Sequence, residues 1–191
     1  MANPHLVSFA DTGLLVVDVQ EKLFHMVMNH EAVERDIQFM LDTAAILNLP
    51  VLATEQYPQG LGSTLPSIKA KLPNPRVEKL TFSCCGQADV MLFFRREARP
   101  KIIIVGIETH VCVEQTALDL LVEGFQVFLA VDAVSCRYSL DHEMALRRME
   151  QAGVVLTTVE TLAFELLGAS GTPKFKAISR LVQERMKLLA V

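Results

Sequence analysis

The sequence lacks the features that would direct the protein to a nucleic acid or a membrane. It carries a formal net charge of −4 and no run of basic residues, so it has no electrostatic footprint for nucleic acid or an anionic membrane surface. No apolar segment is long enough to span a bilayer, and no basic region followed by an apolar core indicates a secretory signal. We therefore expect a cytoplasmic protein, with an organellar location left open, that has neither nucleic acid nor a membrane as a partner.

Cysteine is scarce, and its spacing excludes two common uses of this residue. The four cysteines are Cys84, Cys85, Cys112 and Cys136, and they do not form the C-x-x-C pairs of a metal site. Without a secretory signal they are expected to be free thiols in a reducing compartment. Cys84 and Cys85 are adjacent and too close for an ordinary disulfide, so a buried or pocket-lining position is favoured over redox work. The roles of Cys84, Cys85 and Cys136 stay open.

What the sequence does contain is a regular alternation of strands and helices. Short β-branched or apolar runs predict strands at residues 13–19, 51–54, 76–79, 102–105, 125–131 and 154–158. Helical spacing of apolar residues predicts helices at 33–47, 87–98, from Cys112 onward, and at 139–152, 160–168 and 174–189. The alternation predicts a three-layer α/β/α fold with a mainly parallel, Rossmann-like, doubly wound sheet of about six strands. With no linker or internal repeat, we expect a single domain over residues 1–191.

The central predicted strand runs into a segment that carries a cysteine. Residues 102–105 are all β-branched and apolar, which is typical of a parallel strand buried on both faces. Gly106 ends the run, and Thr109 is a candidate N-cap for the helix that follows. Cys112 therefore lies over the carboxyl end of the sheet, where ligands of open α/β sheets bind. A helix N-terminus at this point would favour the thiolate.

Two further polar residues follow strands at the same edge of the predicted sheet. Asp18 lies near the end of the first strand and Lys79 at the end of the third. A thiol needs a base to become a nucleophile, and an acid beside it can serve, while a lysine would stabilise both the carboxylate and the thiolate. Together they predict a Cys112 nucleophile with Asp18 as its base. Taken singly, such residues are more often a core thiol, a capping acid and a solvated lysine.

Several segments resemble the isochorismatase-like cysteine hydrolases, the superfamily that includes nicotinamidases. Its G-x-x-T-x-x-C-V-x-x-T-A signature is matched closely by Gly106-Ile-Glu-Thr-His-Val-Cys-Val-Glu-Gln-Thr-Ala117. Residues 14–20 resemble the superfamily's first strand, with its catalytic Asp and a following Gln, and residues 79–83 resemble its K-x-x-x-S segment. The loop at residues 54–62 is similar, more narrowly, to the isochorismatase-domain-containing subgroup.

This resemblance implies an activity and the residues that perform it. Asp18 would be the base, Lys79 the third member and Cys112 the nucleophile of a hydrolase that cleaves a carbon–nitrogen bond of a small amide through an acyl-enzyme. In the family a non-proline cis peptide precedes the nucleophile, here between Ile107 and Glu108. The backbone N–H groups of Glu108 and Cys112 would then form the oxyanion hole. The resemblance further implies a small-molecule substrate and a homo-oligomer.

Two departures from the family pattern narrow the choice of substrate. Metal-dependent nicotinamidases carry an Asp-x-His-type cluster after the second strand, where this chain has Glu55, Gln56 and Tyr57. This difference argues against a bound metal and against nicotinamide as the substrate, and no other cofactor is expected. Siderophore-pathway isochorismatases lack the nucleophilic cysteine, so Cys112 argues against isochorismate. The identity of the substrate stays open.

Loops above the same sheet edge are predicted to shape the substrate pocket, through Phe24, Gln56 and Tyr57. His110 is close to Cys112 in sequence, but side chains two positions apart on a helical turn diverge, which disfavours it as the base. An alternative function is a catalytically inactive binding or scaffold protein that retains the fold. A dinucleotide-binding oxidoreductase is disfavoured because no G-x-G-x-x-G follows the first strand.

Overall fold

A computed structural model describes residues 5–73 and 76–189, so the ends of the predicted 1–191 domain lie outside the described residues. Within these ranges the chain forms a six-stranded parallel sheet in the order β3-β2-β1-β4-β5-β6. The strands are β1 (Thr12–Val17), β2 (Val51–Gln56), β3 (Val77–Lys79), β4 (Lys101–Ile107), β5 (Gln126–Ser135) and β6 (Val155–Thr157). The predicted parallel, doubly wound sheet is confirmed.

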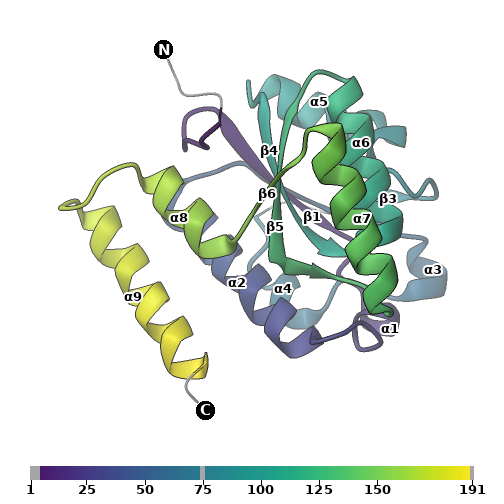
Figure 1. Cartoon of the computed structure of the whole chain (residues 1–191), viewed down its shortest axis with the longest axis horizontal. Helices are drawn as coiled ribbons and strands as arrows, with labels where there is room; N and C mark the ends of the chain where they lie inside the picture. Colours follow the sequence, from purple (N-terminus) through teal and green to yellow (C-terminus); the bar gives the residue numbers. More distant parts are fainter. Residues whose placement is uncertain (1–4, 74–75, 190–191) are drawn as a thin grey trace.

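Helices cover both faces of this sheet (Figure 1). One face carries α2 (His30–Leu47) and α8 (Val159–Leu167), with α9 (Pro173–Leu189) packed against them, and the other carries α5 (Ala88–Arg96), α6 (Glu114–Val122) and α7 (Ser139–Ala152). The connecting segments contain α1 (Glu21–Phe24), α3 (Pro58–Leu61), α4 (Pro66–Lys69), η1 (Cys84–Gly86) and the π-helical η2 (Thr109–Val113). The predicted three layers are therefore present. Among the described residues, no helix is both long and apolar enough to cross a bilayer.

The pleat of the strands divides the buried side chains into two cores. In β1, Leu14 and Val16 belong to the core beneath α2 and α8, whereas Leu15 and Val17 belong to the core beneath α5, α6 and α7. Successive side chains of a strand point to opposite faces, so a strand covered on both sides must be apolar throughout. This constraint explains why the inner strands are visible in the sequence as continuous apolar runs.

The strand order makes β1 the point at which the sheet changes direction. β2 and β3 extend the sheet on one side of β1, and β4, β5 and β6 extend it on the other. The register pairs Val17 at the end of β1 with Gly106 near the end of β4. Ligands of open α/β sheets bind at such a switch point, outside the carboxyl ends of the strands. Asp18 follows β1 and Cys112 follows β4, so both lie at this position.

The ends of β1 and β2 differ by two residues from those that the sequence predicts. β1 ends at Val17 because Asp18 has a left-handed backbone conformation (φ 48°), which is incompatible with an extended strand. β2 is longer than predicted because Thr54, Glu55 and Gln56 pair with the short edge strand β3. The polar residues after the apolar part of β2 are thus part of the sheet and not of a loop.

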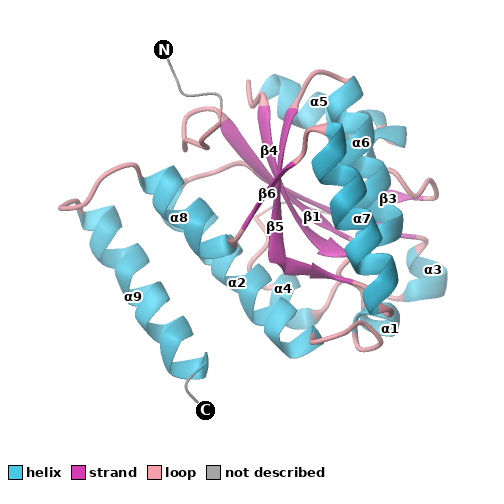
Figure 2. Cartoon of the chain, in the orientation of Figure 1, coloured by secondary structure: helices cyan, strands magenta, loops and turns pink. Residues whose placement is uncertain are grey.

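β5 is also longer than predicted, because it continues through a bulge. Its register against β4 shifts between Ile104 and Gly106, and the resulting bend is visible in Figure 2. Asp132 lies in this region, where its carboxylate accepts the backbone N–H of Val159 at 2.9 Å and pairs with Arg185 of α9 at 3.1 Å. The bulge thereby ties the sheet to the N-terminus of α8 and to the C-terminal helix.

Gly106 is a position where the close approach of β1 to β4 excludes any side chain. Its backbone has φ 117°, and a Cβ atom would lie 2.1 Å from the Val17 carbonyl oxygen. Gly124, after α6, has φ 85° but open space around its Cβ position. We predict that Gly124→Ala lowers the free energy of unfolding by about 1–2 kcal/mol, the cost of a left-handed backbone alone. Gly106→Ala should lower it by at least about 3 kcal/mol.

Denaturant unfolding of the two alanine variants beside the unmodified protein measures this difference directly. Equal losses of stability at Gly106 and Gly124 would show that the close approach to β1 has no cost beyond the backbone conformation.

Candidate active site

Asp18 and Lys79 form a buried ion pair at the carboxyl edge of the sheet. Lys79 Nζ lies 2.7 Å from Asp18 Oδ2, and the lysine and aspartate side chains are 0% and 2% exposed, respectively. The other carboxylate oxygen, Asp18 Oδ1, accepts a hydrogen bond from the Thr54 hydroxyl at 2.7 Å. Residues from the ends of β1, β2 and β3 thus meet in one buried polar cluster. The structure brings Asp18 and Lys79 together, and their catalytic roles stay predictions.

The Lys79 ammonium is surrounded by acceptors. Its Nζ donates to Gln56 Oε1 at 2.7 Å, to the Phe82 carbonyl oxygen at 2.9 Å and, more weakly, to the Thr81 carbonyl oxygen at 3.3 Å. Burial alone would lower the pKa of Lys79, but the negative charge of the Asp18 carboxylate opposes burial, and the pKa of Lys79 stays above its usual value. Lys79 is therefore charged in the resting protein.

Cys112 lies in the π-helical turn η2 and is 7% exposed. Burial raises the pKa of the Cys112 thiol, and the negative charge of the Asp18 carboxylate raises this pKa further against the opposing effect of Lys79. These effects outweigh the stabilisation of a thiolate that we expected from the helix N-terminus. In the resting protein Cys112 is a neutral thiol beside a carboxylate, which is the protonation state that a general base requires of its partner.

The turn before Cys112 contains a cis peptide bond between Ile107 and Glu108, which confirms this implication of the family resemblance. The side chain of Glu108 is buried and pairs with Arg137, in the loop after β5, with 2.9 Å between Oε1 and Nε. The ion pair links the residue that precedes η2 to the loop after β5. The predicted oxyanion-hole roles of the backbone N–H groups of Glu108 and Cys112 stay predictions.

Two histidines connect η2 to α7. His110 belongs to η2 and His142 belongs to α7. His110 Nε2 faces Asp141 of α7 at 3.8 Å, and His142 Nδ1 lies 3.0 Å from the Thr109 hydroxyl. The prediction that Thr109 is an N-cap is wrong, because Thr109 is the first residue of η2 and its hydroxyl contacts α7. Burial lowers the pKa of His142, so this imidazole is neutral near pH 7.

The three predicted pocket residues lie in different environments. Phe24 is fully buried in the core beneath α2, where its ring packs edge to face against His30. Gln56 is 9% exposed and uses its amide oxygen on Lys79. Tyr57 is 52% exposed and lines a cavity of about 420 Å³ beside β3. The substrate contacts proposed for these residues stay predictions.

Two residues of the polar cluster, Thr54 and Cys84, are not predicted from the sequence to be part of the site. Thr54 donates to Asp18, and the fully buried Cys84 lies 3.6 Å from the Thr54 hydroxyl oxygen. Burial raises the pKa of Cys84 to about 11, with a further contribution from Asp18 and an opposing one from Lys79. The position of Thr54 at the end of the predicted strand at residues 51–54 is a usable signal for it. For Cys84, no pattern in the sequence separates it from an ordinary core thiol.

Glu55, which follows the apolar part of β2, belongs to a separate hydrogen-bond network. Its Oε1 accepts the backbone N–H and the hydroxyl of Thr64, both at 2.7 Å, and lies 3.4 Å from Arg76 Nε. Burial favours a higher pKa for Glu55, but these donors together lower it. Glu55 therefore anchors the loop between β2 and β3. Across residues 5–73 and 76–189, no group of three His, Cys, Asp or Glu side chains is arranged to hold a metal ion.

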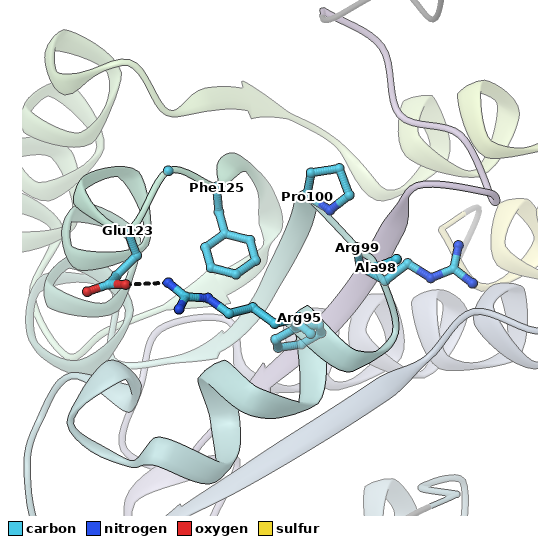
Figure 3. Close-up of a pocket in the computed structure, with 8 residues that line it drawn as sticks. Arg95, Ala98, Arg99, Pro100, Glu123 and Phe125 are labelled. Atoms are coloured by element: carbon cyan, nitrogen blue, oxygen red, sulfur yellow. Dashed lines mark hydrogen bonds and ion pairs between the residues drawn. The ribbon is translucent and has the colours of Figure 1, made fainter.

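A cavity of about 340 Å³ lies at the opposite edge of the sheet, before the amino ends of β4 and β5 (Figure 3). Pro100 and Phe125 line it, and Arg95 reaches across it toward Glu123 with 2.6 Å between guanidinium and carboxylate. This ion pair is exposed, and exposed pairs contribute little to stability. Because the whole of β4 separates this cavity from Cys112, the cavity is not part of the candidate active site.

Comparison with known proteins identifies the family. The sequence profile described as "Isochorismatase domain" matches residues 12–161. The chain belongs to the isochorismatase domain family. It is 41% identical over 171 residues to a Bos taurus protein named "Isochorismatase domain-containing protein 2", and the aligned region covers 90% of this chain and 82% of the bovine protein.

Two solved structures show the same fold in isochorismatase-like proteins. MAR1 ribonuclease from Caenorhabditis elegans is 38% identical with a TM-score of 0.88, and the match covers 93% of this chain and 92% of that one. The YcaC gene product of Escherichia coli, described as an octameric hydrolase of unknown specificity, is 26% identical with a TM-score of 0.87 and covers 97% and 95%. This chain is therefore a member of the isochorismatase-like hydrolases.

Asp18→Asn tests whether the carboxylate keeps Cys112 neutral. The substitution removes a negative charge beside the thiol, so the pKa of Cys112 should fall and its thiolate fraction should rise. We predict that iodoacetamide labels Cys112 at least about tenfold faster at neutral pH in this variant. Mass spectrometry of the peptide that contains Cys112 measures the rate.

The matched control is Asp42→Asn, which removes a carboxylate from an ion pair with Lys71 on the surface, where both side chains are about one-third exposed. This variant should label at the rate of the unmodified protein. Labelling of Cys112 that is unchanged or slower in Asp18→Asn would contradict the proposed electrostatic role of Asp18.

Proposed function

We propose that this protein is a cysteine hydrolase that cleaves the carbon–nitrogen bond of a small amide. Cys112 is the nucleophile, Asp18 is the general base, and Lys79 is the cation that pairs with the Asp18 carboxylate. The observation that carries the proposal is the buried 2.7 Å ion pair between Lys79 and Asp18 beside the Cys112 thiol. Ionisable groups with shifted pKa values gather at active sites because proton transfer requires them there.

The first half of the reaction forms an acyl-enzyme. Cys112 Sγ bonds to the carbonyl carbon of the amide while the thiol proton passes to the Asp18 carboxylate. The carbonyl oxygen becomes an oxyanion, which accepts hydrogen bonds from the backbone N–H groups of Glu108 and Cys112. The carbon–nitrogen bond then breaks, the nitrogen takes the proton from Asp18, and ammonia or an amine leaves.

The second half of the reaction regenerates the thiol. A water molecule attacks the carbonyl carbon of the thioester and gives one proton to Asp18. The carbon–sulfur bond breaks, the carboxylic acid leaves, and the proton on Asp18 returns to Cys112. The charge of Lys79 is constant throughout, so it stabilises the carboxylate before each proton transfer and the sulfur anion during it.

Several features support a small molecule as the substrate. Cys112 is only 7% exposed, which leaves little of the residue accessible to a bulky reactant. The net charge of −4 gives no attraction for RNA, although one similar protein is described as a ribonuclease. We further propose a hydrolase domain spanning residues 1–191 that works in the cytoplasm, where the four free thiols would persist. By analogy with the octameric E. coli protein, we propose a homo-oligomer.

Cys112→Ala should abolish turnover of any small amide that the protein hydrolyses, with a loss of at least about a thousandfold, because no other nucleophile takes the place of the thiol. Ammonia or amine release from a panel of small amides measures this activity. Cys85→Ala is the matched control, since this half-buried thiol contacts the Thr116 carbonyl and lies outside the proposed reaction. Turnover that survives in Cys112→Ala would overturn the mechanism, and a panel without any substrate would favour the inactive binding protein.

A further inference from the structure

Two buried glutamines extend the polar cluster beyond the three proposed catalytic residues. Gln56 Oε1 accepts from Lys79 Nζ at 2.7 Å, while Gln56 Nε2 donates to the Leu80 carbonyl oxygen at 2.8 Å. The amide nitrogen of Gln56 and the ammonium of Lys79 are both donors, so they cannot bond to each other. The amide nitrogen therefore faces the Leu80 carbonyl oxygen, and the amide oxygen faces Lys79. Gln56 therefore presents an oxygen, and not a nitrogen, to the ammonium.

Gln20 in turn holds the backbone of Gln56. Gln20 Oε1 accepts the backbone N–H of Gln56 at 2.7 Å, and Gln20 Nε2 donates to the carbonyl oxygens of Gln56 at 3.0 Å and Gly62 at 2.7 Å. Gln20 is 0% exposed, and every donor and acceptor of its amide has a partner. Gln20 follows Asp18 by two residues, so the segment that supplies the proposed base also positions the residue that contacts Lys79.

The hydrogen bonds of Lys79 explain why an amide is suited to this position. An ammonium has three N–H bonds, and the three acceptors nearest to it are Asp18, Gln56 and the Phe82 carbonyl. Asp18 is the only one of these three acceptors that carries a full negative charge. A neutral amide stabilises the ammonium without cancelling its charge, which leaves that charge available to Asp18 and to a developing thiolate.

We propose that Gln56, held in place by Gln20, is a positioning residue that keeps the Lys79 ammonium beside Asp18 and thereby controls how readily Cys112 reacts. This role deepens the proposed function and rests on it, because it takes Cys112 as the nucleophile. It differs from the substrate-pocket role that the sequence suggests for Gln56. The groups that face Lys79 and can titrate are Asp18 after β1, Cys84 in η1 and Cys112 in η2, and Gln56 adds no charge to them.

Gln56→Met removes the acceptor while it keeps a side chain of similar length. Without the amide oxygen, the ammonium is held less firmly beside Asp18, and the thiolate of Cys112 is less well stabilised. The labelling curve is the rate of Cys112 labelling by iodoacetamide plotted against pH. At each pH below the midpoint of this curve, labelling should then be about tenfold slower than in the unmodified protein. Gln59→Met, at an exposed position three residues along the chain, is the matched control and should leave the labelling curve unchanged.

Gln56→Glu separates this role from a purely structural one. The carboxylate keeps the shape and the acceptor but adds a negative charge, so Cys112 labelling should again be slower than in the unmodified protein. If the side chain at position 56 only filled space and its charge had no effect on Cys112, Gln56→Glu would label at the unmodified rate. Thermal unfolding of the variants verifies that they are folded, and Gln56→Glu decides the question if Gln56→Met does not fold.

The outcomes distinguish this inference from the proposed function on which it rests. Slower labelling of Cys112 in Gln56→Met and Gln56→Glu, with Gln59→Met unchanged, supports the inference. A labelling curve of folded Gln56→Met or Gln56→Glu that overlays the unmodified curve overturns the inference and leaves the proposed function intact. If Cys112 in the unmodified protein is not labelled at any pH while Cys85 is, the proposed nucleophile is wrong, and the inference falls with it.

Discussion

The buried ion pair between Asp18 and Lys79 is the interaction on which the rest of the site depends. A charge left without its partner in the interior costs about 3–5 kcal/mol, so each member of such a pair must be matched closely. This requirement explains the short hydrogen bonds around the Lys79 ammonium and the Thr54 hydroxyl on the second carboxylate oxygen. The ion pair also depends on β3. This short edge strand pairs with the carboxyl end of β2 and so places Lys79 at the carboxyl edge of the sheet.

The same pair determines the chemical state of the thiols. Burial and the Asp18 carboxylate raise the pKa of Cys112, so the pair carries the only full charges at the centre of the cluster until a substrate arrives. The proton then moves from sulfur to carboxylate over a short distance, and the total charge of the group does not change. Cys84 shares this environment, and its pKa of about 11 keeps it protonated. The position of Cys112 at the switch point between β1 and β4, and not a low thiol pKa, is what distinguishes it from Cys84.

Much of the fold could be predicted from the sequence because strands covered on both faces must be apolar, and the helix predicted at 139–152 has these same bounds in the structure. Asp18, Lys79 and Cys112 could be found because each lies at or beyond the carboxyl end of a strand and because the motif around Cys112 is specific. The hydrogen bond of Gln56 with Lys79 could not, since it depends on the pairing of β2 with β3 and on a neighbour 23 residues away. The N-cap predicted at Thr109 is wrong for a similar reason, since the Thr109 hydroxyl contacts His142 of α7, a residue 33 positions away in the sequence.

The central claim is that hydrolysis passes through an acyl group bound to Cys112, and competition between water and hydroxylamine for that group tests it most directly. Amides that share one acyl group but differ in the leaving amine would be hydrolysed in the presence of hydroxylamine, and the ratio of hydroxamate to acid would be measured. The account predicts the same ratio for every leaving amine, because all of these substrates give the same thioester on Cys112 before the nucleophiles compete. A ratio that changes with the leaving amine, in a reaction that Cys112→Ala does not impair, would contradict it.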